Sequence, residues 1–363
     1  MAKIVLDARE YTTSTGRYMS KLIEYLQETD KENVYVVLLR EKDMDKFTPT
    51  NPNFSKVMTP FKEFTFGEQL GFAKQLYGLK ADLVHFGMVQ QPVLYFKKSV
   101  STIHDLTTVR FVNPSKNPVV FFIKQQVYKA VIWYAAHKSK VIFTGSNFVK
   151  EDLVKYSKIK PAKIVVTYEA ADYIKEASKP IKSLAGKQFL MYVGRPMPHK
   201  NLWRLIEAFD SLKGVHPELQ LVLAGQTDKN YSDIERRVSS NGIDDVHFTG
   251  YISEGELKWL YENCQAYIFP SLSEGFGLPG LEAMAHGAPV VSSNATCLPE
   301  IYGDAAHYFD PKDKQSIASA INDVLVDKGL RDRLVKAGRE QVKKYSWKRM
   351  AEQTLEQYNK TAG

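Results

Sequence analysis

The feature that most constrains the fold of this chain is a repeated alternation of short apolar segments with helical segments. In the first half, segments of the strand type occur at residues 3–7, 34–39, 82–86, 100–103, 140–144 and 163–167. Helical periodicity fills the intervals, for example at 16–27. Nearly continuous apolar strands that alternate with helices are typical of a parallel sheet covered on both faces. The first half is therefore predicted to be a doubly wound α/β domain.

The second half repeats this pattern after an interruption. Its strand-like segments are 189–193, 219–225, 245–250, 266–270 and 288–293, with helices expected at 201–212, 253–263 and 316–326. Residues 177–187, "ASKPIKSLAGK", have little apolar periodicity and are interpreted as a linker. We therefore expect one domain at 1–180, with helix 346–363 packing back on it, and a second domain at 187–345. Ligands of such sheets bind beyond the carboxyl ends of the strands, here in a cleft between the domains.

Composition excludes several classes of protein. The 363 residues are 44% hydrophobic and 25% charged, as in an ordinary soluble globular protein. Cys264 and Cys297 are the sole cysteines, which argues against a disulfide framework and against a structural zinc site. The first ten residues carry charges where a signal peptide would need an apolar region, and no apolar run is long enough to cross a bilayer. A cytoplasmic protein is expected.

The charge is unevenly distributed. Residues 1–185 hold 28 Lys and Arg against 18 Asp and Glu, whereas the remainder holds 21 against 23. The basic first half indicates an anionic partner, such as a phosphorylated substrate or an anionic lipid surface, or else simple Lys-rich solubility. The helix expected at 119–140 is interpreted as core, with contact to a membrane surface as the alternative. Nucleic-acid binding is not expected, because no recognised motif is present and the charge is dispersed.

Two cations follow the first strand of the second domain. In "GRPMPHKN", at 194–201, Arg195 and Lys200 lie between a strand and a helix. Fixed positive charges next to the free N–H groups of a helix N-terminus suit a diphosphate, although two solvated surface cations would give the same pattern.

A glycine-rich segment, "SEGFGLPGLEAMAHGAPVV" at 273–291, matches the G-x-G-x-x-G dinucleotide motif at 275–280. That motif needs an acid at the end of the following strand, but Ser293 and Asn294 stand there. Two carboxylates bracket the glycines instead. Glu274 in the loop can hold sugar hydroxyls, and Glu282, expected in the first helical turn after Pro279, can hold a ribose. With Arg195 and Lys200, these residues indicate a nucleotide-sugar site.

At this point the sequence resembles the retaining glycosyltransferases of family 4. The matching segments are "EGFGLPGLEAMAHGAPVV" with its two glutamates, "GRPMPHKN", "FTGYISEGEL" at 248–257, "TIHDL" at 102–106 and "STGRYMSKL" at 14–22. "ADLVHF" and "FTGSNFVKEDL" are similar to the bacterial surface-polysaccharide branch, whose members are often mannosyltransferases. The resemblance implies a GT-B fold, in which two Rossmann-like domains face each other across a cleft.

The resemblance also implies roles for individual residues. Glu274 would contact the donor sugar, Glu282 the ribose, and Arg195 with Lys200 the diphosphate. The further positions implied are the backbone N–H groups of Phe276, Gly277 and Leu278 near the sugar and phosphate, a base pocket of Tyr251, Ile252 and Leu257, His104 facing the reacting sugar with Asp105 beside it on the acceptor side, and Gly16 and Arg17 at the phosphate or acceptor side. Many relatives have two glycines near the first strand, whereas Thr15 precedes Gly16 here.

The expected activity is transfer of a hexosyl group, with mannose as the first candidate, from a GDP- or UDP-sugar to a glycan or lipid-linked acceptor. Same-face attack would explain retention; Glu274 as a nucleophile is the less favoured route. No metal or other cofactor is expected to be required, since Asp43 and Asp45, the one Asp-x-Asp pair, are interpreted as solvated. The acceptor would contact loops 11–17, 61–69 and 88–94, and peripheral contact with the inner face of the cell membrane stays open.

Three alternatives remain. A sugar-nucleotide isomerase of the 2-epimerase type would need further catalytic carboxylates in the first domain. An NAD-dependent oxidoreductase is disfavoured by the missing acid after the strand at 288–293. A non-catalytic binding protein would be expected to have lost one of Arg195, Lys200, Glu274 or Glu282, and all four are present.

Overall fold

A computed structural model describes residues 1–13, 15–63, 65–111 and 118–363 of the protein. The chain divides into two compact units. Unit 1 comprises Met1–Val109, Phe122–Glu169 and Ser346–Gly363, and unit 2 comprises Arg110–Phe121 and Ala170–Tyr345. Among the described helices, none is both long and apolar enough to cross a membrane.

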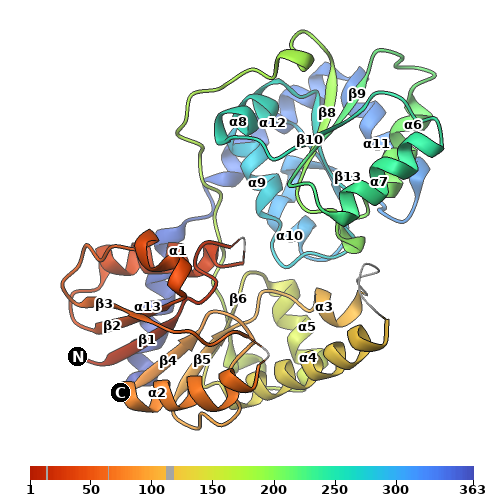
Figure 1. Ribbon diagram of the computed structural model, residues 1–363. Helices are drawn as coiled ribbons and strands as arrows, with labels where there is room; N and C mark the ends of the chain where they lie inside the picture. Colours follow the sequence, from red (N-terminus) through yellow and green to blue (C-terminus); the bar gives the residue numbers. More distant parts are fainter. Residues whose placement is uncertain (14, 64, 112–117) are drawn as a thin grey trace. The chain divides into compact units, whose positions relative to one another are not determined.

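Unit 1 is built on a parallel sheet whose seven described strands run in the order β3-β2-β1-β4-β5-β6-β7 (Figure 1). Its strands are β1 (Lys3–Asp7), β2 (Val34–Leu39), β3 (Phe54–Met58), β4 (Leu83–Phe86), β5 (Ser99–Thr102), β6 (Ile142–Thr144) and β7 (Ile164–Val166). The central strands β1 and β4 are almost wholly buried and consist mainly of Val, Ile, Leu and Phe, because helices cover both faces of the sheet. The sequence did not predict β3, since this edge strand mixes buried and exposed residues and lacks a continuous apolar run.

The helices of unit 1 pack on both faces of its sheet. They are α1 (Arg17–Thr29), α2 (Ala73–Leu79), α3 (Thr107–Arg110), α4 (Pro118–Lys138), of which the part from Phe122 belongs here, α5 (Asn147–Ser157) and α13 (Trp347–Ala362), with the short turns η1 (Glu41–Lys46), η2 (Glu68–Phe72) and η3 (Pro161–Lys163). The C-terminal helix α13 packs against α1. Its Tyr358 hydrogen-bonds to Nδ1 of the buried His85, whose pKa is lowered to about 3 by burial and by nearby His104.

Unit 2 is built on a second parallel sheet, with six described strands in the order β10-β9-β8-β11-β12-β13 (Figure 1). Its strands are β8 (Phe189–Val193), β9 (Gln220–Ala224), β10 (Val246–Gly250), β11 (Ala266–Phe269), β12 (Val290–Ser293) and β13 (Ala306–Phe309). Its helices and turns are α6 (Leu202–Leu212), α7 (Lys229–Ser240), α8 (Glu254–Asn263), α9 (Leu278–Ala285), α10 (Leu298–Tyr302), α11 (Lys314–Val326), α12 (Lys328–Val342), η4 (Lys182–Leu184), η5 (Pro198–Lys200) and η6 (Gly303–Ala305). The sequence missed β13, a short edge strand.

The two sheets share one topological property. In each, the first strand of the unit is central: β1 lies between β2 and β4, and β8 lies between β9 and β11. The order of the strands therefore reverses at β1/β4 and at β8/β11, and in doubly wound sheets ligands bind beyond the carboxyl ends of the strands at such a point. The predicted α/β class with two doubly wound parallel sheets is confirmed, and the loops after these four strands are the places to look for function.

Helix α4 differs from its sequence interpretation. Its inner face is core, since Ile132, Ala135 and Ala136 are fully buried. Its outer face is not, because the side chains of Phe122 and Trp133 are 61% and 53% exposed. The interpretation of this helix as core is therefore right for one face and wrong for the other. Its apolar residues surround the helix, so their periodicity does not show which face is covered.

Candidate functional site

Two predicted site residues form an ion pair at the reversal point of the unit 2 sheet. Lys200 ends η5, in the loop after β8, and Glu274 lies in the loop after β11. The Nζ atom of Lys200 is 2.7 Å from Oε1 of Glu274, and the side chains are 19% and 12% exposed. The two residues are 74 positions apart in sequence, and the fold brings them together because β8 and β11 are adjacent strands.

Asn201 holds the lysine loop against the loop after β11. Its backbone is left-handed, with φ of 59°, a conformation that asparagine tolerates better than most residues. Its Nδ2 group donates to the carbonyl oxygens of Pro270 and Pro311, at 3.1 and 2.7 Å. The position of Lys200 is thus fixed by its neighbour before any ligand arrives. Sequence analysis missed this role, because an asparagine before a helix is usually an N-cap and Asn201 makes no side-chain cap bond.

The segment after Glu274 is fixed by its backbone. The N–H of Glu274 donates to Oγ1 of Thr296 at 3.1 Å. Gly277, with φ of 96°, is the N-cap of α9, and its carbonyl oxygen accepts a hydrogen bond from the Tyr302 hydroxyl at 2.6 Å. A Cβ atom at Gly277 would lie 2.6 Å from that hydroxyl and 2.7 Å from Cδ2 of Leu298, so glycine is required by conformation and by space. Phe276, just before it, is 5% exposed.

Glu282 occupies a different helical position from the one predicted. Helix α9 begins at Leu278, with Pro279 as its second residue, so Glu282 is the fifth residue and lies outside the first turn. The prediction was one position out because it took Pro279 as the first helical residue. Glu282 is half-buried and lies on α9, the helix that Gly277 caps.

Arg195 and the predicted base pocket are more open than the ion pair. The Arg195 side chain is 72% exposed, and its Nη2 lies 3.7 Å from Oδ2 of Asp228, whose side chain also caps α7. The two predicted diphosphate cations therefore have different partners. Tyr251, which follows β10, is 85% exposed, whereas Ile252 and Leu257 are half-buried.

In unit 1, His104 follows β5 and is held by a carboxylate. Its Nδ1 is 3.5 Å from Oε1 of Glu169, and the Tyr18 ring packs edge-on against it at 5.2 Å. Burial disfavours the charged ring, but the hydrogen bond and charge of Glu169, with Asp105 nearby, raise the pKa of His104. The Nε2 atom is buried and has no hydrogen-bond partner within the described part of the chain. A backbone hydrogen bond with Gly87 also raises the pKa of the ring, and a protonated His104 carries a second N–H at the buried Nε2. Sequence analysis missed Glu169, which lies 65 positions away.

The other predicted residues of unit 1 have structural contacts. Oδ1 of Asp105 accepts the N–H of Thr107 at 2.7 Å, where α3 begins. Gly16 is the N-cap of α1, and its Cα packs so closely on the Glu10 carbonyl that a Cβ atom would overlap it. Arg17, the first residue of α1, is half-buried. Ser14 of the predicted motif and Phe64 of the predicted acceptor loops lie outside the described residues.

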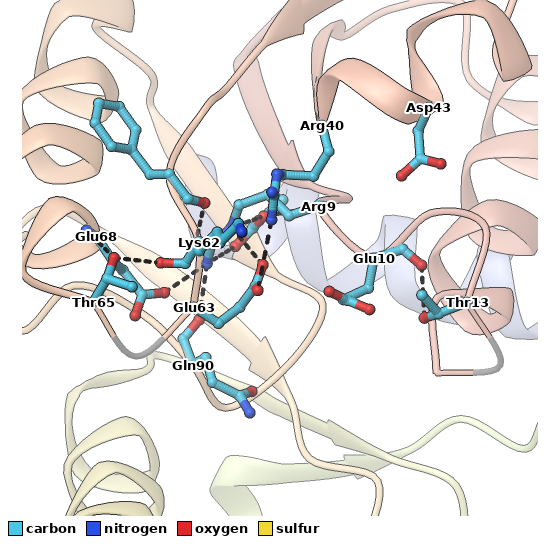
Figure 2. A network of polar contacts seen from close by, with 12 residues as sticks. Arg9, Glu10, Thr13, Arg40, Asp43, Lys62, Glu63, Thr65, Glu68 and Gln90 are labelled. Carbon is cyan, nitrogen blue, oxygen red and sulfur yellow. Dashed lines mark hydrogen bonds and ion pairs between the residues drawn. The ribbon is translucent and has the colours of Figure 1, made fainter. Parts of the chain in front are cut away.

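A buried arginine that sequence analysis missed joins the loops around the β1/β4 reversal point (Figure 2). Arg9 is 1% exposed. Its Nε and Nη2 lie 2.9 Å from the two carboxylate oxygens of Asp7, and Nη2 is 2.9 Å from Oε1 of Glu68. Its guanidinium also donates to the carbonyl oxygens of Phe61 and Gln90, at 3.4 and 3.3 Å. Burial opposes its charge, but these carboxylates raise the pKa of Arg9.

Arg9 therefore connects three chain segments. It lies in the loop after β1, and its partners come from 61–68 and from the loop after β4. A small pocket lies beside it, lined by residues at the carboxyl ends of β1 and β4 and in the loops that follow, among them Asp7, Glu10, Gly16 and Gly87. The partners Phe61, Glu68 and Gln90 lie in two of the predicted acceptor loops, 61–69 and 88–94, and Arg9 itself comes just before the third, 11–17.

Asp43 also corrects a sequence interpretation. It is 1% exposed, and its Oδ1 accepts a hydrogen bond from the Thr12 hydroxyl at 2.5 Å, so it is buried and not solvated. Among the described residues, no group of three or more His, Cys, Asp or Glu side chains is arranged to hold a metal ion.

Comparison with known proteins gives a family. Residues 174–341 match the model of the family "Glycosyl transferases group 1". O-antigen chain mannosyltransferase B of Escherichia coli is 30% identical over 277 residues, which cover 72% of this chain and 70% of that protein. The chain covers 60% of O-antigen chain mannosyltransferase RfbU of Salmonella typhimurium and 29% of the serotype-specific mannosyltransferase WbdA of Escherichia coli, each 30% identical over the matched part.

Solved structures share the fold. Sucrose-phosphate synthase from Thermosynechococcus elongatus matches with a TM-score of 0.76 and 20% identity, covering 99% of both chains. The Anabaena protein HepE, solved in complex with UDP-glucose, matches with a TM-score of 0.75 and 14% identity, covering 99% of this chain and all of that one. At these identities the likeness concerns the fold, and it confirms the predicted GT-B class.

Proposed function

The chain belongs to the group 1 glycosyltransferases, and on that premise we propose that it transfers a hexosyl group, with mannose as the first candidate, from a nucleotide-diphosphate sugar. The acceptor is a glycan or a lipid-linked glycan of polysaccharide synthesis, and the anomeric configuration is retained. The mannosyltransferase relatives support this function, and none of the proteins reported above supports the isomerase or oxidoreductase alternatives.

The observation that carries the proposal is the Lys200–Glu274 pair at the β8/β11 reversal point. A lysine ammonium has three N–H donors, and one of them is directed to Glu274 at 2.7 Å. The remaining donors can bind the donor's diphosphate while Glu274 holds hydroxyls of the sugar. The pair thus suits a ligand in which a sugar and a phosphate are directly joined, which is the chemistry of a nucleotide sugar.

The rest of the donor site is assigned around this pair. We assign the ribose to Glu282, the outer diphosphate oxygens to Arg195, and the base to Tyr251, Ile252 and Leu257. The backbone N–H groups of Phe276, Gly277 and Leu278 lie at the start of α9, where a helix N-terminus favours an anion. The Gly277 conformation, held by Tyr302, keeps these groups in place without a side chain.

The chemical step is the loss of the nucleoside diphosphate from the sugar. Positive charge develops on the sugar ring and negative charge on the leaving diphosphate, and Lys200, Arg195 and the α9 N-terminus stabilise that negative charge as it forms. The acceptor oxygen bonds to the anomeric carbon from the face that the diphosphate leaves, and the leaving phosphate oxygen accepts the proton of that acceptor hydroxyl. No metal ion or other cofactor is needed in this scheme.

Unit 1 supplies the acceptor side. We assign the protonated His104 to a hydroxyl of the reacting sugar, and Glu169 to keeping the ring protonated and oriented. Asp105 and Arg17 belong to the acceptor side, and Gly16 to the approach of phosphate or acceptor. The acceptor itself contacts the loops that Arg9 connects. For a lipid-linked acceptor, the protein works in peripheral contact with the inner face of the cell membrane.

Thermal stabilisation by GDP, UDP, ADP, CMP and NAD tests the donor class. A ligand at about 100 times its Kd stabilises the folded state by roughly 2.7 kcal/mol, which gives a readily measured rise in Tm. Stabilisation by one nucleoside diphosphate is expected and identifies the base; consumption of the matching mannosyl or glucosyl nucleotide then identifies the sugar. Stabilisation by NAD alone would contradict the proposal and favour an oxidoreductase.

A further inference from the structure

Exposed apolar side chains are concentrated on one face of unit 1. Six of its large apolar residues, apart from the first methionine, are more than half exposed: Phe66, Leu70, Phe96, Phe122, Ile123 and Trp133. They lie on η2 and its approach, on the segment between β4 and β5, and on α4. Single exposed apolar residues need no explanation, but a cluster of this kind marks an interaction site.

Hydrogen bonds show that the three elements adjoin. The N–H of Val93 donates to Oε1 of Gln69 on η2, at 2.8 Å. The Tyr134 hydroxyl of α4 donates to the carbonyl oxygen of Val93 at 2.6 Å. The Tyr77 hydroxyl of α2 donates to the carbonyl oxygen of Leu94 at 3.1 Å. Figure 1 shows α2 and α4 along the same side of unit 1. The exposed residues therefore belong to one continuous surface, which we call the α2–α4 face.

The exposed residues on each helix form a stripe. On α4 the exposed positions are 122–124, 126, 127, 130, 133 and 137, and on η2–α2 they include 66, 70, 74 and 77; in both, exposed positions recur every three or four residues. Such stripes are continuous along a helix surface. The α4 residues on the opposite side pack into the core, so the outer stripe is a face of an apolar helix that the described residues of unit 1 leave exposed.

The charges of the α2–α4 face have one sign. Lys74, Lys97, Lys98 and Lys124 are exposed on its elements. Between described residues 66 and 140 the acidic side chains are Glu68, Asp82 and Asp105. Glu68 is buried against Arg9, and the carboxylates of the other two accept backbone N–H groups. Asp82 is the one exposed acid of this described stretch, against four exposed lysines on the face. Aromatic and aliphatic side chains with this excess of lysines complement a surface that is apolar beneath and anionic at its rim.

The α2–α4 face is also continuous with the loops that Arg9 connects. Glu68 opens η2 and is directed inward to Arg9, whereas Phe66 and Leu70 on either side of it are exposed. One short segment thus has its inner side in the Arg9 network and its outer side on the face.

We propose that the α2–α4 face docks the protein onto an anionic phospholipid bilayer, with the aromatic and aliphatic side chains entering the interface and the lysines contacting the headgroups. This contact brings the Arg9-linked loops next to the membrane, where a lipid-linked acceptor would present its glycan. The docking needs no donor and no catalysis, so it can be tested independently of the transferase activity.

The test is co-sedimentation of the full chain with vesicles of phosphatidylcholine, with and without phosphatidylglycerol. Binding is expected with phosphatidylglycerol and should weaken with added salt. Each lysine near such a surface contributes about fivefold to partitioning, which corresponds to about 1 kcal/mol, so Lys74→Gln/Lys97→Gln should weaken binding about 25-fold. Phe122→Ser/Trp133→Ser should weaken it at least about tenfold, because two buried aromatic groups are lost.

A matched control is Val215→Ser/Val326→Ser, which removes two apolar side chains of unit 2 that are 68% and 65% exposed. It should bind vesicles like the unchanged chain. All variants should keep their melting temperature and nucleotide-induced stabilisation, because the assigned donor residues lie in unit 2. If a face variant unfolds, Ile123→Ser takes its place and should also weaken binding to the vesicles.

Three results would overturn the proposal. Binding that does not depend on phosphatidylglycerol would refute the requirement for an anionic lipid. Equal loss of binding in the unit 2 control would show that the α2–α4 face is not the docking surface. A concentration-dependent dimer that the face variants abolish, without vesicle binding, would assign the face to a second copy of the chain. Loss of transfer activity with vesicle binding intact would refute the proposed function alone.

Discussion

Replacing Lys200 with methionine is the most informative change, because Lys200 has a geometric partner and an assigned chemical role. Methionine keeps much of the side-chain volume and removes the charge. If Lys200 stabilises the leaving diphosphate, the loss should resemble removal of one preorganised donor from a charge-stabilising site, which is about 10²–10³-fold in kcat, or roughly 3–4 kcal/mol. Unit 2 should still fold in this variant.

The same substitution should lower stability by a smaller amount. It leaves the Glu274 carboxylate without its 2.7 Å partner in a site where that side chain is 12% exposed. Loss of one partner from a fully buried ion pair costs about 3–5 kcal/mol. Because water reaches both ends of this pair, we expect about 1–3 kcal/mol, the range for an unsatisfied polar group. At roughly 2–4 °C per kcal/mol for a unit of this size, Tm should fall by several degrees.

A double-mutant cycle separates the two effects. In Lys200→Met/Glu274→Gln no carboxylate is left unpaired, so Tm should recover most of the loss. The kcat/KM for the nucleotide sugar should not recover, because the cation is still absent. The measurements are differential scanning fluorimetry and donor turnover on the same preparations. Activity of Lys200→Met within about threefold of the unchanged enzyme, or recovery of activity in the double variant, would refute the assigned role.

Three further predictions concern other parts of the site. Glu169 raises the pKa of His104. The activity and stability that protonated His104 contributes should therefore be complete below the ordinary histidine pKa near 6.5 and should be lost as pH rises through the raised pKa. Glu169→Gln should move this loss to lower pH in a kcat/KM profile. Gly277→Ala should destabilise the protein in thermal melting by more than the 1–2 kcal/mol that a left-handed alanine costs, because Tyr302 and Leu298 crowd the new Cβ. Arg9→Met should cost about 3–5 kcal/mol of stability in urea unfolding, since it leaves Asp7 and Glu68 buried without their cation, and should raise KM for acceptor but not for donor.

Each of these predictions has a control and a contradicting result. An unshifted pH profile in Glu169→Gln would mean that His104 does not act in its protonated form. Gly242→Ala is the control for crowding, because φ there is 63° but nothing lies within 4 Å of the added Cβ; equal losses at both glycines would dismiss the role of Tyr302. Arg236→Met, at an exposed ion pair, should be nearly neutral. A change in donor KM in Arg9→Met, with acceptor KM unaltered, would refute the role of the Arg9 contacts in acceptor binding.

The sequence singled out more of the residues that lie together in unit 2 than in unit 1, for a physical reason. In unit 2 the recognition elements are local: glycines 275–280 must form a tight loop at a helix N-terminus, and Lys200 and Glu274 follow predicted strands directly. Such features have signatures over a few residues. In unit 1, Arg9 has partners up to 81 positions away and Glu169 lies 65 positions from His104. No local pattern distinguishes these residues from solvated charges, so their contacts can be identified only once the fold is known.

Helix α4 shows a second limit of sequence analysis. The hydrophobic effect depends on apolar area and not on direction, so a helix with apolar residues all round looks the same whether a second layer of protein covers it or not. Its fold position decides the matter: Ile132 and Ala136 fill the core beneath the helix, while Phe122 and Trp133 remain more than half exposed. The lysines around these residues then argue for a charged partner instead of a missing core layer. Because η2 has Glu68 bound to Arg9 on one side and Leu70 exposed on the other, contact at this face and the arrangement of the Arg9-linked loops should influence each other.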